Sequence, residues 1–156
     1  MVSLLVLVRH GDAEPKGAAG DKARRLTPEG LERLRKSYPG LFADLEPRGE
    51  LELWVSPAVR AQMTAEVVAD ALGVDPSEGI PHESLYDQDD ETFLSELRAS
   101  DAGTVVAVGH VPFMRNMVAW LCGEDLPFPK GAVAAIEFPQ GKIARGAGRL
   151  LWLREA

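Results

Sequence analysis

Short runs of leucine and β-branched residues, each stopping abruptly at a polar group, most constrain the fold of this chain. Leu4–Val8 and Thr104–Val108 are continuous apolar runs, which is typical of central strands covered on both faces. Leu51–Val55 predicts a further strand. Because stretches with apolar residues at helical spacing lie between these runs, we expect an α/β fold: a three-layer α/β/α sandwich with a mostly parallel central sheet. An antiparallel strand at its edge would be unsurprising.

Capping residues and apolar spacing place the other elements. Thr27-Pro28 predicts the start of a helix that Pro39-Gly40 ends or kinks, and Ser56-Pro57 predicts the start of a second helix. The polar, basic and glycine-rich residues 11–25 predict a mobile loop. The remaining predictions are a weaker strand at Ile80–Leu85, helices around Phe93–Leu97 and Phe113–Leu121, and closing strands at Ala132–Phe138 and Leu150–Leu153.

Length and composition limit the kind of protein and its partners. The 156 residues, 46% of them hydrophobic, predict one globular domain over residues 1–156. With 17 basic and 24 acidic residues the formal net charge is −7, which would repel nucleic acid and anionic lipid, so we expect neither a nucleic-acid nor a membrane partner. No signal peptide or membrane span is visible, which favours a cytoplasmic protein. No oligomeric state is predicted.

The single cysteine, Cys122, cannot close an intrachain disulfide or build a multi-thiolate zinc site, and it fits a reducing compartment. It follows the apolar residues Ala119, Trp120 and Leu121, so we interpret it as an ordinary packed thiol.

Three of the predicted strands are followed at once by residues that suit an anion site. Arg9-His10-Gly11 follows the first, Ser56-Pro57 leads to Arg60 after the second, and Gly109-His110 follows the third. Because ligands of parallel α/β sheets bind outside the carboxyl ends of the strands, we expect these segments to share one crevice. In the first turn of a helix, Arg60 would add a bidentate guanidinium to free backbone amides.

Each of these features also has an ordinary structural interpretation. Gly11 and Gly109 would let the backbone approach a ligand closely, but a lone histidine at a strand end is commonly a hydrogen-bonded structural residue. His82 is interpreted as such a structural or surface residue. Two histidines could also hold a metal, yet only Asp12 and Glu14 stand near His10, so no metal site is predicted.

The same segments resemble the histidine phosphatase superfamily, which has the phosphoglycerate-mutase-like fold. Its R-H-G motif corresponds here to Leu7–Glu14, and further similar blocks are Leu26–Gly30, Ser56–Ala65 and Val106–Pro112, in the family's order and spacing. The Asp21–Arg25 stretch and Leu85-Tyr86-Asp87 are similar to the SixA-type phosphohistidine phosphatase branch. Val111 departs from that branch, which more often carries asparagine at this position.

The resemblance implies roles for individual residues. His10 would be the nucleophile that becomes phosphorylated, and Arg9, Arg60 and His110 would surround the transferred phosphoryl group, with Gly11 beside it. A neutral imidazole attacks phosphorus through one ring nitrogen when the other is held as a donor. Fixed cations would stabilise the charge on the phosphoryl oxygens, and no metal or organic cofactor is implied.

The general acid is the open question of this site. Many members of the superfamily place a glutamate after the third strand region. Glu83 is the nearest match here, with Asp87 and Asp12 as lesser ones, and a surface role for Glu83 is an equal alternative. An alkoxide leaving group needs a proton donor, whereas the imidazole of phosphohistidine can leave already protonated on its ring. A site in which no residue is clearly assigned as the general acid is therefore compatible with an N-phosphorylated substrate.

We therefore predict a phosphatase that acts through a phosphohistidine intermediate, with phosphohistidine on a protein as its favoured substrate. The alternatives are a phosphatase of small phosphomonoesters and a non-catalytic phosphate-binding module. The loop residues Lys16, Lys22, Arg24 and Arg25 could contact a protein partner, although a solvated charged loop is the simpler interpretation.

Overall fold

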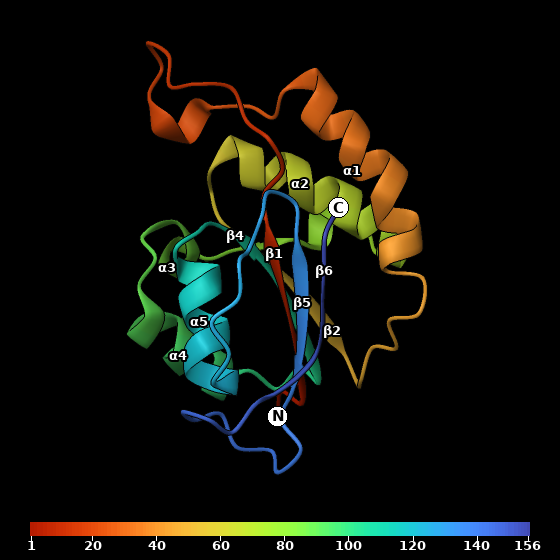
Figure 1. Ribbon diagram of the computed structural model, residues 1–156, viewed down its shortest axis with the longest axis vertical. Coiled ribbons are helices and arrows are strands. Elements are labelled where there is room, and N and C mark those ends of the chain that lie inside the picture. Colours follow the sequence, from red (N-terminus) through yellow and green to blue (C-terminus); the bar gives the residue numbers. More distant parts are fainter.

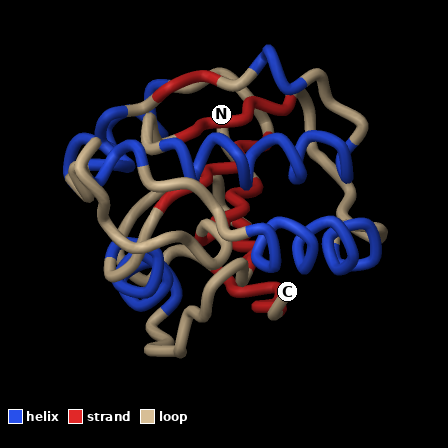
Figure 2. The backbone as a smooth tube through the Cα atoms, turned by 90° about the horizontal axis from the view of Figure 1, so that it is seen from above, coloured by secondary structure: helices blue, strands red, loops and turns tan.

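The computed structural model describes residues 1–156 and has one six-stranded sheet with helices on both of its faces (Figure 1; Figure 2). The strands are β1 (Leu4–Arg9), β2 (Leu51–Val55), β3 (Ile80–Pro81), β4 (Thr104–Gly109), β5 (Val133–Glu137) and β6 (Arg149–Arg154). The helices are α1 (Pro28–Leu41), α2 (Val59–Leu72), α3 (Glu83–Tyr86), α4 (Asp90–Ala99) and α5 (Phe113–Cys122), with short 3-10 turns η1 (Asp21–Ala23) and η2 (Pro76–Glu78).

The order of strands across the sheet is β3-β2-β4-β1-β5-β6. The first four are parallel to one another, whereas β5 and β6 are antiparallel to their neighbours. The predicted three-layer sandwich with a mostly parallel sheet is therefore confirmed, and both closing strands form its antiparallel side. None of the helices combines the length and apolarity needed to cross a lipid bilayer.

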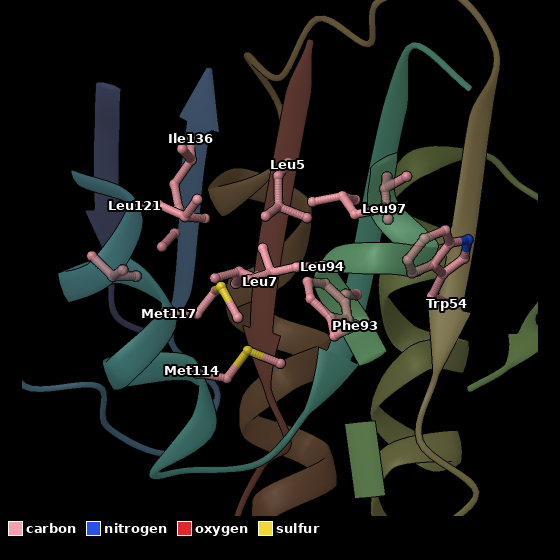
Figure 3. Close-up of a cluster of buried hydrophobic side chains, with 14 of the residues drawn as sticks. Leu5, Leu7, Trp54, Phe93, Leu94, Leu97, Met114, Met117, Leu121 and Ile136 are labelled. Atoms are coloured by element: carbon pink, nitrogen blue, oxygen red, sulfur yellow. The ribbon is translucent and has the colours of Figure 1, made fainter. Parts of the chain in front are cut away.

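Alternation along β1 divides the core into two layers. Leu4, Val6 and Val8 pack with the apolar faces of α1 and α2, and Leu5 and Leu7 pack with those of α4 and α5. Figure 3 shows the second layer, in which side chains from both helices point at the sheet: Phe93, Leu94 and Leu97 from α4, and Met114, Met117 and Leu121 from α5. Burial on both faces explains why the central strands are continuously apolar.

The start of α1 is confirmed, and of the two alternatives predicted at Pro39-Gly40, an end or a kink, the end is wrong by one residue. The Gly30 amide donates to Thr27 Oγ1 at 2.9 Å, so Thr27 caps the helix as predicted. Instead of stopping at Pro39-Gly40, the helix runs to Leu41. Tyr38 and Leu41 are buried and anchor the last turn to the core, so the single hydrogen bond lost at Pro39 does not end the helix.

The start of α2 is displaced from its predicted cap. The helix begins at Val59 with Ala58 as the capping residue, whose side chain makes no capping hydrogen bond. The Ser56 hydroxyl instead lies 2.7 Å from His110 Nε2, across the sheet edge. The same hydroxyl accepts from the Ala58 amide at 3.3 Å, so Ser56 links the start of α2 to the end of the neighbouring strand β4.

The predicted strand at Ile80–Leu85 is wrong in most of its length. Only Ile80–Pro81 pairs with β2, and residues from Glu83 onward form the single helical turn α3. Pro81 has no amide hydrogen for a strand ladder, and the helical turn allows Leu85 to be fully buried in the core.

Two leucines with opposite exposure test this division of the core. Leu97 is fully buried between α4 and the sheet, whereas Leu151 on β6 is 39% exposed. We expect Leu97→Ala to lower the free energy of unfolding by about 2 to 5 kcal/mol, because it leaves a cavity, and Leu151→Ala to lower it by about 0.5 kcal/mol. Urea unfolding midpoints measure both, and equal losses would contradict the assigned packing.

Candidate active site

The parallel register brings two histidines together at one sheet edge. Arg9, the last residue of β1, pairs with Gly109, the last residue of β4, so His10 and His110 leave the sheet side by side. Their ring centroids are 5.2 Å apart, and both side chains are buried. The predicted convergence of these strand ends is present in the structure.

The His10 ring is held in one protonation state. Its Nδ1 lies 2.7 Å from the Gly11 carbonyl oxygen, which can only accept, so Nδ1 carries the hydrogen. Burial, followed by the positive charges of Arg60 and Arg9, lowers the pKa of His10 to about 4. At neutral pH the ring is therefore uncharged, with the Nε2 lone pair available.

His110 is fixed by contacts of the opposite sense. Arg60 Nη2, a donor, lies 3.5 Å from His110 Nδ1, so Nδ1 accepts and Nε2 donates to the Ser56 hydroxyl at 2.7 Å. Burial, followed by the nearby His10 and Arg60, lowers the pKa of His110 to about 3. This second imidazole is also neutral at physiological pH.

A buried arginine, Arg60, and a half-buried one, Arg9, accompany the histidines. Arg60, in the first turn of α2 as predicted, donates to the Asp21 backbone carbonyl at 2.9 Å. Arg9 donates to the Phe128 carbonyl at 2.9 Å. The Nε–H groups of both arginines are buried and have no hydrogen-bond partner. A buried donor without an acceptor is costly, so this pair of orphaned donors favours an anionic ligand nearby.

Asp21 is the main residue that the sequence interpretation did not place in the site. Its carboxylate accepts from Arg60 Nη2 at 3.1 Å, from Arg24 Nη1 at 3.2 Å and from the Tyr86 hydroxyl at 2.8 Å. The hydrogen bond from Tyr86, followed by those from the arginines, lowers the pKa of Asp21 to about 2. One signal was available: an acidic residue stands alone among four basic ones in residues 16–25.

These groups line a pocket of about 440 Å³ outside the carboxyl ends of β1 and β4. Four cationic side chains and one carboxylate lie around it, although the whole chain has a net charge of −7. The lining residues are Arg9, His10, Ala13, Asp21, Arg24, Arg60, Tyr86, Gln88, His110, Val111 and Lys130. The pocket is thus a local cationic site on an acidic protein.

The three carboxylates considered as general acids lie outside this lining. Glu83 opens α3 with a side chain that is 66% exposed and 3.7 Å from Lys22 Nζ. Asp12 accepts from Lys130 at 2.7 Å, and Asp87 is exposed. Asp21 is therefore the one carboxylate of the pocket, and its low pKa keeps it ionised at neutral pH.

The two glycines at the strand ends have a packing role. Gly11 does not line the pocket, and a Cβ atom there would lie 3.0 Å from Leu34 Cδ1. A Cβ atom at Gly109 would lie 3.0 Å from Met114 Cε. The Gly11 amide donates to Thr64 Oγ1 at 3.2 Å, which helps to fix the peptide that orients His10.

Of the four basic residues of the loop, one reaches the pocket. Arg24 lines it, whereas Lys22 lies against Glu83 and 4.7 Å from the centre of the Tyr86 ring. Lys16 and Arg25 are exposed. The loop residues 11–25 thus form one wall of the site, at the top of Figure 1, instead of extending freely from it.

The remaining histidine and the cysteine have structural surroundings. His82 stacks on Trp54 with ring centroids 4.0 Å apart, and its Nδ1 lies 2.8 Å from Glu96. Burial raises the pKa of the Cys122 thiol to about 11, so the thiol stays protonated. Both interpretations from the sequence, a structural histidine and a packed thiol, are confirmed. No group of three or more His, Cys, Asp or Glu side chains is arranged to hold a metal ion.

Known proteins are similar to this chain in sequence and in fold. The family described as the histidine phosphatase superfamily (branch 1) matches residues 5–89. Phosphohistidine phosphatase SixA of Escherichia coli (strain K12) is 30% identical over 152 residues, which cover 94% of this chain and 89% of that protein.

Solved structures agree with the sequence comparison. The protein histidine phosphatase SixA complexed with tungstate superposes with a TM-score of 0.82 at 28% identity, over 97% of this chain and 96% of that one. A candidate SixA from Agrobacterium tumefaciens gives 0.79 at 25% identity, over 100% and 99% of the two chains. The fold, the family match and the curated relative concur: the chain belongs to branch 1 of the histidine phosphatase superfamily.

Proposed function

We propose that this protein removes the phosphoryl group from phosphohistidine on a protein, through a phosphohistidine formed on its own His10. The observation that carries the proposal is the state of His10: a buried neutral imidazole whose Nδ1 is held by the Gly11 carbonyl, in a pocket lined by four cationic side chains. The SixA relatives are named for this activity, and one of them was solved with tungstate, an oxyanion.

In the first step, His10 Nε2 forms a bond to phosphorus while the bond from phosphorus to the substrate imidazole breaks. The electron pair of that bond returns to the substrate ring, which keeps the proton on its other nitrogen and leaves neutral. The Gly11 carbonyl stabilises the positive charge that develops on the His10 ring. Arg9 and Arg60 stabilise the phosphoryl oxygens, so the step depends on positioning and fixed charge.

In the second step, water bonds to phosphorus and His10 Nε2 regains its electron pair. Both protons of the water stay with the inorganic phosphate. His110 presents its Nδ1 toward Arg60 and is held there by Ser56, so it is suited to orient groups around the phosphoryl centre. The proposed reaction needs no metal, because the arginines supply the positive charge.

The positions of Asp21 and Glu83 favour phosphohistidine over a phosphomonoester as the substrate. An alkoxide leaving group needs a proton donor within hydrogen-bond reach. The pocket carboxylate, Asp21, is ionised, and Glu83 lies outside the lining with an exposed side chain. A substrate imidazole that leaves already protonated suits this arrangement. The single cysteine is consistent with action in the reducing cytoplasm.

Covalent labelling tests the intermediate. Incubation with an activated phosphoryl donor should place one acid-labile, base-stable phosphoryl group on His10, and His10→Gln should abolish it. Arg60→Lys should slow turnover about a hundredfold, because an ammonium cannot replace the guanidinium fork. His82→Asn is the matched histidine control and should label as the wild type does. If the wild-type protein takes up no label and hydrolyses no substrate in the presence of a metal chelator, the proposed phosphatase activity is wrong and the alternative of a phosphate-binding module is supported.

A comparison of leaving groups tests the substrate class. With Glu83→Gln, we expect hydrolysis of a phosphohistidine peptide to stay within about twofold of the wild-type rate, because the substrate imidazole needs no external proton. Initial rates with that peptide and with a panel of phosphomonoesters measure the preference. If the wild type favours esters and Glu83→Gln loses that activity, Glu83 is the general acid and the phosphohistidine preference is wrong.

The low pKa values of the two histidines predict acid-dependent stability. The unfolded chain takes up protons on both imidazoles below about pH 6.5, whereas the folded chain does so only near the lowered pKa values of about 4 and about 3. Stability therefore falls as the pH drops from 6.5 toward 4, on the order of 2 kcal/mol for each histidine by pH 5, or about 4 kcal/mol for the two together. Urea unfolding at several pH values measures it. The variant His10→Gln with His110→Gln should show a smaller slope, and an equal slope would contradict the assigned burial.

A further inference from the structure

We call the cationic pocket around His10 and His110 the phosphate pocket, and a second pocket of about 300 Å³ adjoins it. Its apolar wall consists of Leu94, Phe113 and Met117, which are buried, and Trp120, which is half-buried. Asp90 and Glu91, in the first turn of α4, form its acidic rim. We call this the flanking pocket. It combines an apolar wall with a negatively charged mouth.

The two pockets adjoin at Gln88, and we call the pair of pockets the groove. Gln88 lines both of them, and Val111 of the phosphate pocket is followed directly by Pro112 of the flanking pocket. Gln88 Oε1 accepts a hydrogen bond from the Phe113 amide at 2.8 Å, which fixes the ridge between the pockets against the start of α5. Gln88 holds a positive φ of 53°, an uncommon conformation for this residue type. A ligand that passes this ridge lies in both pockets.

The charges of the groove are opposite at its two ends. The phosphate pocket carries four cationic side chains. Asp90 and Glu91 are exposed and have no lysine, arginine or histidine nitrogen within 4.0 Å, whereas Asp12, Asp21 and Glu83 beside the phosphate pocket each have a basic partner. The acidic rim of the flanking pocket is therefore free to meet a positive charge from outside the chain.

We propose that the flanking pocket receives a lysine or arginine side chain of the protein segment that carries the phosphohistidine. The methylene stem would pack against Phe113 and Trp120, and the charged head would meet Asp90 and Glu91, as long cationic side chains do when their stems lie on apolar surface. The proposal rests on the proposed function and names the local sequence that the substrate would have. In this proposal, residues of α4 and α5 select the protein segment that binds as substrate.

Peptide binding tests this proposal without requiring turnover. The probe is a fluorescent peptide with a non-hydrolysable phosphohistidine analogue in an alanine host, in which lysine replaces each of the flanking positions in turn. Fluorescence anisotropy gives the dissociation constant for every peptide. We expect lysine at one or two positions to tighten binding about fivefold over alanine, and this ratio to fall to about one in the variant Asp90→Asn with Glu91→Gln.

The matched control is Glu46→Gln with Glu78→Gln, which removes the same amount of negative charge. Both glutamates are exposed, neither has a basic partner, and neither lines either pocket. It should keep the lysine-to-alanine ratio of the wild type. Lysine peptides that bind no better than alanine peptides, or an equal loss in the control, would overturn the proposal. Retained lysine dependence in a protein that fails the His10 labelling test would overturn the proposed function alone, and turnover without lysine dependence would overturn the flanking pocket alone.

Discussion

Parallel pairing of β1 with β4 and of β4 with β2 is the constraint on which the site depends. Parallel strands in register end at the same edge, and here the register sets Arg9 opposite Gly109 and Val55 opposite Val108. The residues that follow each strand are therefore neighbours, whatever their distance along the chain. In this register the side chains of each central strand alternate between the two layers of the core, and a shift by one residue would exchange the layers.

Burial and positive charge act in the same direction on the two histidines. Burial disfavours the protonated ring, and the nearby arginines disfavour it further, so both imidazoles are neutral well below pH 7. The same arginines would stabilise an oxyanion. One set of charges thus keeps the nucleophile unprotonated and prepares the pocket for its substrate, and Asp21 limits the excess of positive charge while the pocket holds no ligand.

What the sequence predicted correctly depends on short-range patterns. The strand runs, the position of Arg60 in the first turn of α2 and the convergence of His10 with His110 all follow from local periodicity and from the geometry of parallel sheets. Asp21 was missed as a site residue because its contacts with Arg60 and Tyr86 span 39 and 65 positions and depend on the path of a loop. The sequence placed Ser56 at the start of α2, where its hydroxyl accepts from the Ala58 amide, but a local capping rule cannot foresee its second hydrogen bond, to His110, 54 positions away.

The two edge strands of the sheet, β3 and β6, have features that hinder pairing with a strand from another molecule. On one side, β3 contributes only Ile80 and Pro81, and proline offers no amide hydrogen to an incoming strand. On the other side, β6 carries a register shift against β5 and has Arg149 and Arg154 at its ends, where they pair with Glu137 and Asp44. A strand from another molecule would meet proline or paired charge, so the sheet is protected against edge-to-edge aggregation.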